Sequence, residues 1–193
     1  MTNMDFLPDG YSIPEAGNKY YKFQKGENRF RILTSPIVGM EHWNFDNKPV
    51  RTKMGVGVDI SQVRPDKDGT PGKVKHFWAM PVWDYEDGSL KVLEITQKGI
   101  MKAIKELASD KDWGSPVSYD LVVTRDGDGM ETDYGVIPKP AKPVAKEASD
   151  ALQAACEAGF DLEALYVGGD PFTGTGKAPA QPGEIDIDDI PFE

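Results

Sequence analysis

Polar and apolar residues alternate through much of the chain before position 140, a pattern typical of β-strands with one buried face. The run ENRFRILTS, for example, alternates through Phe30 and Ile32 before it reaches a Ser-Pro turn. In the run VKHFWAMPVWDY, Pro81 predicts an edge position or a bulge, because proline has no N–H for the ladder. We predict strands within residues 20–35, 39–45 and 49–54, with Asp46-Asn47 as the turn between the last two. We also predict a hairpin within 74–95 turned at Asp87-Gly88 and a closing hairpin within 118–138.

Two stretches predict helices instead, one from its apolar period and one from its alanine content. TQKGIMKAIKELASD places Ile100 and Ile104 on one face, and Thr96 is its expected N-cap. The Ala-rich run at residues 148–159 predicts a short second helix. Residues 59–72 contain chain-breaking and charged residues without any period, which predicts a long exposed loop.

This order of strands, one helix and two more strands is the order of an OB-fold. By this fold-level analogy we predict an all-β fold with one or two helices, namely an OB-fold five-stranded Greek-key barrel plus a disordered acidic C-terminal tail. The expected parts are an N-terminal arm at 1–18, the barrel at 19–140, a Pro/Lys joint with a short helical segment at 141–166, a flexible linker at 167–183 and an acidic partner-binding tip at 184–193.

Composition narrows the class of protein. The apolar fraction of 39% is enough for a core. The chain has no run of roughly 18 apolar residues, so we expect no membrane span. The N-terminus lacks the basic and apolar regions of a secretion signal, and the single cysteine, Cys156, suits a reducing compartment. We therefore expect a cytoplasmic protein.

Charge is distributed unevenly along the chain. Residues 19–75 carry 12 basic and 6 acidic residues, a local net charge of +6. Residues 147–193 carry Lys177 against 11 acids, a local net charge of −10. This asymmetry indicates a surface that binds polyanions and an acidic appendage.

The patterns that resemble catalytic or metal sites are incomplete. PFTGTGKA lacks the first glycine and the final Ser or Thr of a phosphate-binding loop. DGDGME has Met130 where a calcium loop needs an oxygen ligand, so a hairpin turn is the favoured interpretation. His42, His76 and Cys156 are too few for a structural zinc site. We expect no catalysis, no cofactor and no metal.

Aromatic residues alternate with basic ones, a combination suited to single-stranded nucleic acid. Aromatic rings stack on unpaired bases while Lys and Arg follow the phosphates, so that binding tolerates any sequence and weakens with salt. The candidate binding residues are Tyr20, Tyr21, Lys22, Lys25, Arg29, Arg31, Trp43, Phe45, Lys48, Arg51, Lys53, Lys73, Lys75, Phe77, Trp78, Trp83 and Tyr85.

The alternative is that these aromatic rings fill the core, as in any small barrel. Alternation divides residues 76–85 into two sets, and either set can be the one that faces the core. We expect at least two of Trp43, Trp78, Trp83 and Tyr85 to lie on the outside.

The ending EIDIDDIPFE combines acids with exposed apolar residues. A solvated tail explains the aspartates but not the apolar residues, whereas a short peptide that docks on a basic pocket with an apolar floor explains both. The candidate partner-binding residues are Asp186, Asp188, Asp189, Ile190, Pro191 and Phe192.

Two resemblances extend this interpretation. DIDDIPF is similar to the acidic tip of bacterial single-stranded DNA-binding proteins, which recruits replication and repair enzymes. The runs YYKFQKGENRFRIL, KHFWAMPVWDYEDGSLKVLEITQKGI and DYGVIPKP resemble a family of bacteriophage single-stranded DNA-binding proteins, over about residues 18–140.

The resemblance implies an OB-fold that coats single-stranded DNA, rather than RNA, during phage replication, recombination and repair. The resemblance assigns the basic and aromatic residues named earlier to the binding groove. It makes the tip a hook for replication or recombination proteins such as a polymerase, helicase or nuclease. In the bacterial tip the phenylalanine comes last, whereas Glu193 follows Phe192 here. The tail has a second expected role, competing with DNA for the basic groove.

Two other function classes remain open at the sequence level. An OB-fold adaptor that acts through its acidic tail would use the aromatic residues as core and would not bind nucleic acid. A magnesium-dependent nuclease would need carboxylates such as Asp126, Asp128 and Asp133 to hold the metal.

Overall fold

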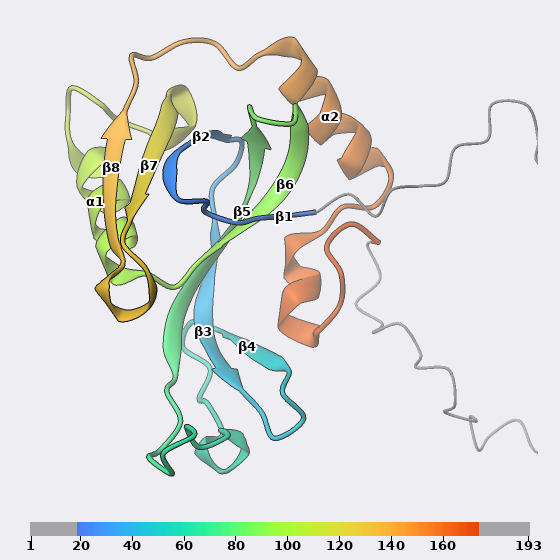
Figure 1. Cartoon of the computed structure of the whole chain (residues 1–193). Helices are drawn as coiled ribbons and strands as arrows, with labels where there is room; N and C mark the ends of the chain where they lie inside the picture. Colours follow the sequence, from blue (N-terminus) through green and yellow to red (C-terminus); the bar gives the residue numbers. More distant parts are fainter. Residues whose placement is uncertain (1–18, 174–193) are drawn as a thin grey trace, which may run out of the picture.

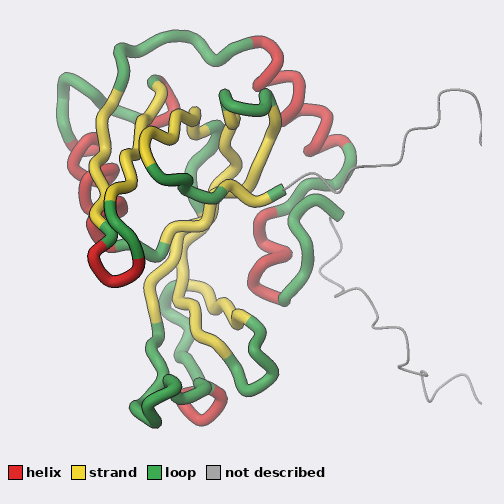
Figure 2. The backbone as a smooth tube through the Cα atoms, in the orientation of Figure 1, coloured by secondary structure: helices red, strands yellow, loops and turns green. Residues whose placement is uncertain are grey.

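The computed structural model describes residues 19–173, and most of their regular structure is β-sheet, as Figures 1 and 2 show. The predicted all-β character with one or two helices is confirmed for this part of the chain. The strands are β1 (Tyr20–Tyr21), β2 (Gly26–Ile32), β3 (Ile37–Trp43), β4 (Pro49–Lys53), β5 (Lys75–Asp84), β6 (Ser89–Ile95), β7 (Asp120–Asp126) and β8 (Asp133–Pro138). The α-helices are α1 (Lys98–Ser109) and α2 (Lys146–Glu157), and the short 3-10 helices are η1 (Ile60–Gln62), η2 (Pro116–Ser118), η3 (Gly129–Glu131) and η4 (Leu162–Val167).

The strands pair in the order β1-β6-β5-β2-β7-β8, and the β3–β4 hairpin joins this sheet through β5. All the pairs are antiparallel except β1 with β6. The predicted turns between β3 and β4 and between β5 and β6 are confirmed. Each contains a residue with positive φ, Asn47 at 59° and Gly88 at 64°, and these are residue types that tolerate this conformation.

Strand β5 changes its partner halfway along one edge. Its first half pairs with β3 and its last three residues pair with β2, while β6 pairs with it along the other edge. Pro81 lies at the change, where its carbonyl accepts a hydrogen bond of 3.0 Å from the backbone N–H of Leu33. The predicted edge position is therefore wrong, because β5 is central. The missing N–H of Pro81 lies between the end of the β3–β5 ladder and the start of the β2–β5 ladder, where no hydrogen bond from it is needed.

Both faces of β5 and β6 are buried, each by a different cluster. Met80, Val82 and Leu93 point into the main core, which α1 covers with Ile100 and Ile104. On the opposite side, a second cluster contains Phe77, Ala79, Val92 and Leu165. We call this second side of β5 and β6 the outer face. The two alternating sets of β5 are thus both covered, one by the main core and one by residues near the C-terminus.

Residues 158–173, which we call the C-terminal segment, follow α2 and pack on this outer face, as Figure 1 shows in orange. Pro171 is buried, and the ring of Phe172 lies 5.1 Å from that of Phe160. The predicted linker from residue 167 therefore begins too early, since the chain is packed to Phe172. The predicted arm at 1–18 and the tip at 184–193 lie outside the described residues.

Helix α1 begins one residue later than the sequence predicts. Its N-cap is Gln97 rather than Thr96, and no side chain caps the first turn. Ile100, Met101 and Ile104 form its buried face, as the 3.6-residue period indicates. Within the described part of the chain, neither α-helix has the length and apolar character that a membrane span requires.

The β3–β4 hairpin and the chain that follows it extend away from the main sheet (Figure 1). We call residues 37–74 the β3–β4 arm. The predicted exposed loop at 59–72 is largely confirmed, although it contains the short turn η1 and the buried side chain of Val63.

Candidate nucleic-acid interface

The β3–β4 arm exposes two aromatic rings. Trp43 is 47% exposed and Phe45 is 60% exposed. Between them, the side-chain oxygen of Asn44 accepts hydrogen bonds from the backbone N–H groups of Asp46 and Lys48, at 3.0 and 2.9 Å. These bonds fix the turn, and the arm therefore presents both rings to solvent next to the exposed side chain of Lys48.

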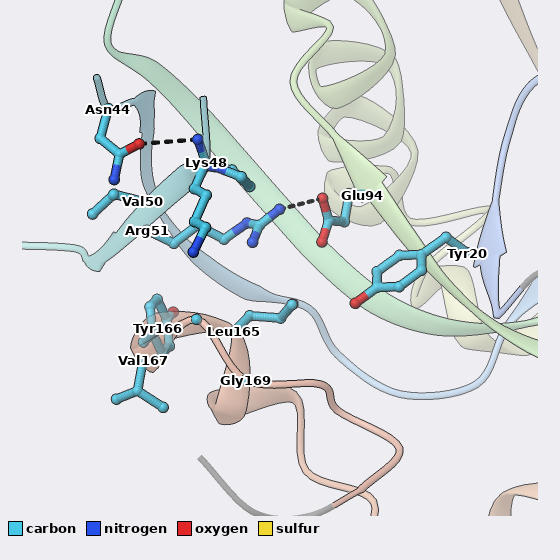
Figure 3. A pocket seen from close by; sticks show the side chains of 12 residues that line it. Tyr20, Asn44, Lys48, Val50, Arg51, Glu94, Leu165, Tyr166, Val167 and Gly169 are labelled. Atoms are coloured by element: carbon cyan, nitrogen blue, oxygen red, sulfur yellow. Dashed lines mark hydrogen bonds and ion pairs between the residues drawn. The ribbon is translucent and has the colours of Figure 1, made fainter. Parts of the chain in front are cut away.

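A cleft of about 710 Å³ lies between the arm and the C-terminal segment. Figure 3 shows its lining, with Asn44, Lys48 and Arg51 from the arm on one side and Tyr166 and Val167 from η4 on the other. Glu94 of β6 and Tyr20 of β1 also line it. The cleft therefore joins residues that are far apart in the sequence, and it opens beside the aromatic turn.

Arg51 is held by two glutamates. Its guanidinium forms ion pairs of 2.9 Å with Glu41 and 2.7 Å with Glu94, and its side chain is only 10% exposed. Burial raises the pKa of Glu94, Arg51 opposes this change, and Glu41 reinforces it. The charge of Arg51 is thus offset locally, which leaves Lys48 as the exposed cation of the cleft.

Tyr20 lies at the far side of the cleft from the arm. Burial raises the pKa of its hydroxyl, and the carboxylates of Glu94 and Asp170 add to the effect. The ring therefore remains neutral at physiological pH and can donate a hydrogen bond.

The predicted binding residues fall into three groups by exposure. Lys22, Lys25, Arg29, Trp43, Phe45, Lys48, Lys53, Lys73 and Lys75 are exposed, and Tyr20, Tyr21, Arg51, Trp78 and Tyr85 are half-buried. Arg31, Phe77 and Trp83 are buried, at 1%, 0% and 9% exposure. Arg31, Phe77 and Trp83 therefore cannot contact a nucleic-acid strand in this conformation, because protein atoms cover them.

The expectation that at least two of four aromatic side chains lie on the outside is wrong. Of Trp43, Trp78, Trp83 and Tyr85, only Trp43 is exposed. Trp78 packs against the main core, and its ring N–H donates to His76 at 3.1 Å. Tyr21 also packs against the main core, through Phe30.

A separate basic cluster surrounds Asp120 at the start of β7. Its buried carboxylate accepts hydrogen bonds from Arg29, Arg31 and Tyr85 and pairs with Lys142 at 2.9 Å. Burial alone would raise the pKa of Asp120, but the bonds from Lys142, Arg29 and Arg31 outweigh it and hold this pKa at about 2. The cluster joins β2, β7 and the chain after β8, which is a structural role for Arg31.

The sequence did not indicate several residues of the cleft and its surroundings, among them Asn44, Tyr166 and Lys19. Asn44 is visible in the sequence only as a turn residue. Tyr166 and Lys19 come from opposite ends of the described chain, and no local pattern brings them together.

Within residues 19–173 no group of three or more His, Cys, Asp or Glu side chains could hold a metal ion. The three aspartates considered for a nuclease do not form such a group. Asp128 instead pairs with Lys25 at 3.2 Å. The predicted tip residues, Asp186 to Phe192, lie outside the described residues.

Comparisons of the chain with protein-family models, with curated proteins and with solved structures found no match. The assignment of a function therefore depends on the geometry above and on the sequence patterns.

Proposed function

We propose that this protein binds single-stranded DNA without sequence preference and without catalysis, through the β3–β4 arm and the cleft beside it. The observation that carries the proposal is the pair of exposed rings, Trp43 and Phe45. They belong to the turn from which Asn44 and Lys48 line the cleft. Each ring that stacks on a base contributes roughly 1–3 kcal/mol, and such stacking accepts any base. The lysine provides the salt-dependent contact with phosphate.

An adaptor whose aromatic residues all belong to the core is less well supported. Burial in a core does not account for Trp43 and Phe45, because both rings are largely in solvent. Large exposed aromatic groups next to a cation are typical of surfaces that bind a ligand.

We also propose that the body is an OB-fold. The supporting observation is the connectivity, in which β2 pairs with both β5 and β7, β5 pairs with β6, β7 pairs with β8, and α1 connects β6 to the second hairpin. The β3–β4 arm is then an enlargement of the loop between the first and second barrel strands. That loop is one of the places where OB-folds bind oligonucleotides.

The resemblance to bacteriophage single-stranded DNA-binding proteins supports a role in protecting DNA during phage replication, recombination and repair in the host cytoplasm. Under this proposal the tip, from Asp186 to Phe192, recruits a polymerase, helicase or nuclease. The net charge of −10 in residues 147–193 supports competition between the tail and DNA for the basic surface.

The first test is tryptophan fluorescence of the full chain during titration with oligo-dT, at low and high salt, with a duplex of equal length as control. We expect quenching by the single strand only, weakened by salt, and we expect Trp43→Phe to remove most of it. Trp113→Phe is the matched control, because Trp113 packs against Tyr119 away from the cleft. If oligo-dT neither quenches the fluorescence nor shifts the protein in a mobility assay, the proposal is wrong.

A further inference from the structure

The C-terminal segment covers a surface with the same chemistry as the arm. Leu165 is 2% exposed and packs in the cluster formed by Phe77, Ala79 and Val92 on the outer face. The ring of Tyr166 meets that of Phe77 edge-on at 6.1 Å, and its hydroxyl donates to the carbonyl of Val38 at 2.8 Å. An aromatic ring of β5 is thus buried by an aromatic ring of the segment.

Two lysines at the border of this face are paired with the segment in the same manner. Lys53 of β4 pairs with Glu163 at 2.8 Å and lies 5.2 Å from the ring centre of Tyr166. Lys19 pairs with Asp170 at 3.6 Å and lies 5.2 Å from the ring centre of Phe172. Each lysine therefore has one carboxylate and one aromatic ring from the segment.

A nucleotide offers the same two groups, an anionic phosphate and a flat aromatic base. The segment is also wholly acidic in its charged residues, which are Asp161, Glu163 and Asp170. Its charge and its rings thus match a short single strand laid on the same face.

We propose, on the basis of the function proposed above, that the outer face is a second surface for single-stranded DNA and that the C-terminal segment occupies it in the absence of DNA. The second surface consists of Lys19, Tyr20, Lys53 and Phe77. It is continuous with the cleft, because Tyr20 belongs to both. A strand bound on the arm would extend onto the outer face when the segment leaves.

The segment is built to leave as a unit, because hydrogen bonds within it hold its shape. The N–H of Asp161 donates to the carbonyl of Pro171 at 2.8 Å, and the N–H of Gly169 donates to that of Ala164 at 2.9 Å. The two ion pairs with the body are half-exposed, with Lys53 at 53% and Glu163 at 60%, so water and salt weaken them.

Displacement has a measurable consequence for affinity. If the surface is open only a fraction of the time, the apparent affinity for DNA falls to that fraction of its intrinsic value, and weakening the cover restores it. A variant that shifts a mostly closed cover toward the open state tightens DNA binding by up to about tenfold if the open fraction of the native chain is near one in ten.

The experiment compares two charge-matched double variants of the full chain. Glu163→Gln with Asp170→Asn removes both carboxylates that face the lysines. Asp150→Asn with Glu157→Gln removes two exposed carboxylates of α2 and changes the net charge equally. We expect the first variant to bind oligo-dT about tenfold more tightly than the second at low salt, with a smaller ratio at high salt. Equal affinities of the two variants would overturn the inference.

A second measurement follows the segment directly. In methyl NMR spectra of the native chain, we expect the Leu165 signal to move toward its value in an unpacked chain as oligo-dT is added. The signal of Val123, in the main core, is the control and should stay in place. A stationary Leu165 signal with quenched Trp43 fluorescence would overturn the second surface but leave the proposed function intact. If oligo-dT changes neither signal, both proposals are wrong.

Discussion

The β3–β4 arm and the outer face are built from the same kinds of residue but differ in what lies over them. On the arm, Trp43 and Phe45 are open to solvent next to Lys48. On the outer face, Phe77 is fully buried, and the nearby Lys53 is paired with Glu163, which is 110 residues away in the sequence. Composition therefore predicts which residue types could form a surface for nucleic acid, whereas contacts distant in sequence decide which of these residues are exposed.

The largest effect is expected for a substitution outside both regions, at Asp120, which joins β7 to β2. Strand β2 in turn pairs with the end of β5. Asp120→Asn leaves the buried Arg31 without its charged partner, so we expect a loss of about 3–5 kcal/mol in the free energy of unfolding. Urea unfolding measures it. The binding of oligo-dT by the folded fraction should change far less, since Asp120 belongs to neither surface. A loss of binding with normal stability would contradict the separation of the two roles.

The same variant has a pH signature. The pKa of Asp120 is about 2 in the folded chain, below its ordinary 3.8, so its stabilising contribution is complete above about pH 4 and is lost as the pH falls toward 2. We expect the native chain to lose more stability over this interval than Asp120→Asn does. Parallel curves for the two proteins would show that the carboxylate is not the group responsible.

The next largest effect is a loss of affinity for oligo-dT, expected when the exposed rings of the arm are removed while the covered outer face is left unchanged. Trp43→Ala with Phe45→Ala should weaken binding to oligo-dT at least about 30-fold, because two lost stacks remove roughly 2 kcal/mol or more. Fluorescence anisotropy of labelled oligo-dT measures it. Ile60→Ala, which truncates another exposed residue of the arm, should leave the affinity unchanged. Equal losses in both variants would mean that the rings do not stack on bases.

A smaller effect is expected where the two regions meet. Tyr166→Phe keeps the ring over Phe77 but removes the hydrogen bond to Val38. The C-terminal segment is then held less firmly, and affinity for oligo-dT should rise by about fivefold at most, since one such bond contributes about 1 kcal/mol. The anisotropy titration used for the arm also measures this change. Weaker binding would indicate that the hydroxyl contacts the DNA instead.

The smallest effect is expected at Lys48, in the turn of the β3–β4 arm. Lys48→Ala should weaken binding to all sequences alike and reduce the slope of log affinity against log salt by about 0.7, the value for one phosphate of a single strand. Titrations at several salt concentrations measure this slope. Lys102→Ala on α1 is the control, because Lys102 is exposed but distant in the fold from the cleft lining. An unchanged slope in Lys48→Ala would remove Lys48 from the interface.

The local features of the fold could be predicted from the sequence. The hairpins follow from alternation and turn residues, and α1 follows from its apolar period. Pro81 was harder to interpret, since its missing N–H marks an exchange of partners that no local pattern reveals. The packing of residues 167–172 was missed because their Gly and Pro content is typical of linkers. Only their contacts with the outer face explain why these residues are packed.

The residue types of the candidate site could be predicted from the sequence, but their exposure and their positions in the fold could not. Alternation along β5 correctly divides its residues into two sets. It could not reveal that a distant segment covers the set that contains Phe77. The charges were similarly ambiguous, because Arg31 and Lys48 look alike in sequence, yet one anchors Asp120 and the other is exposed on the arm.

The change of partner at Pro81 also bears on how such a chain can evolve. The β3–β4 arm joins the rest of the sheet through residues 75–79 of β5, before the change of partner, whereas β2 pairs with residues 82–84 after it. Lengthening or shortening the hairpin turn or the loop before β5 therefore leaves the β2–β5 and β5–β6 registers intact, and longer loops add little entropic cost. Selection can thus alter the reach of the arm while the rest of the sheet keeps its register. Under the proposed function, this change would alter the length of single-stranded DNA that one molecule contacts.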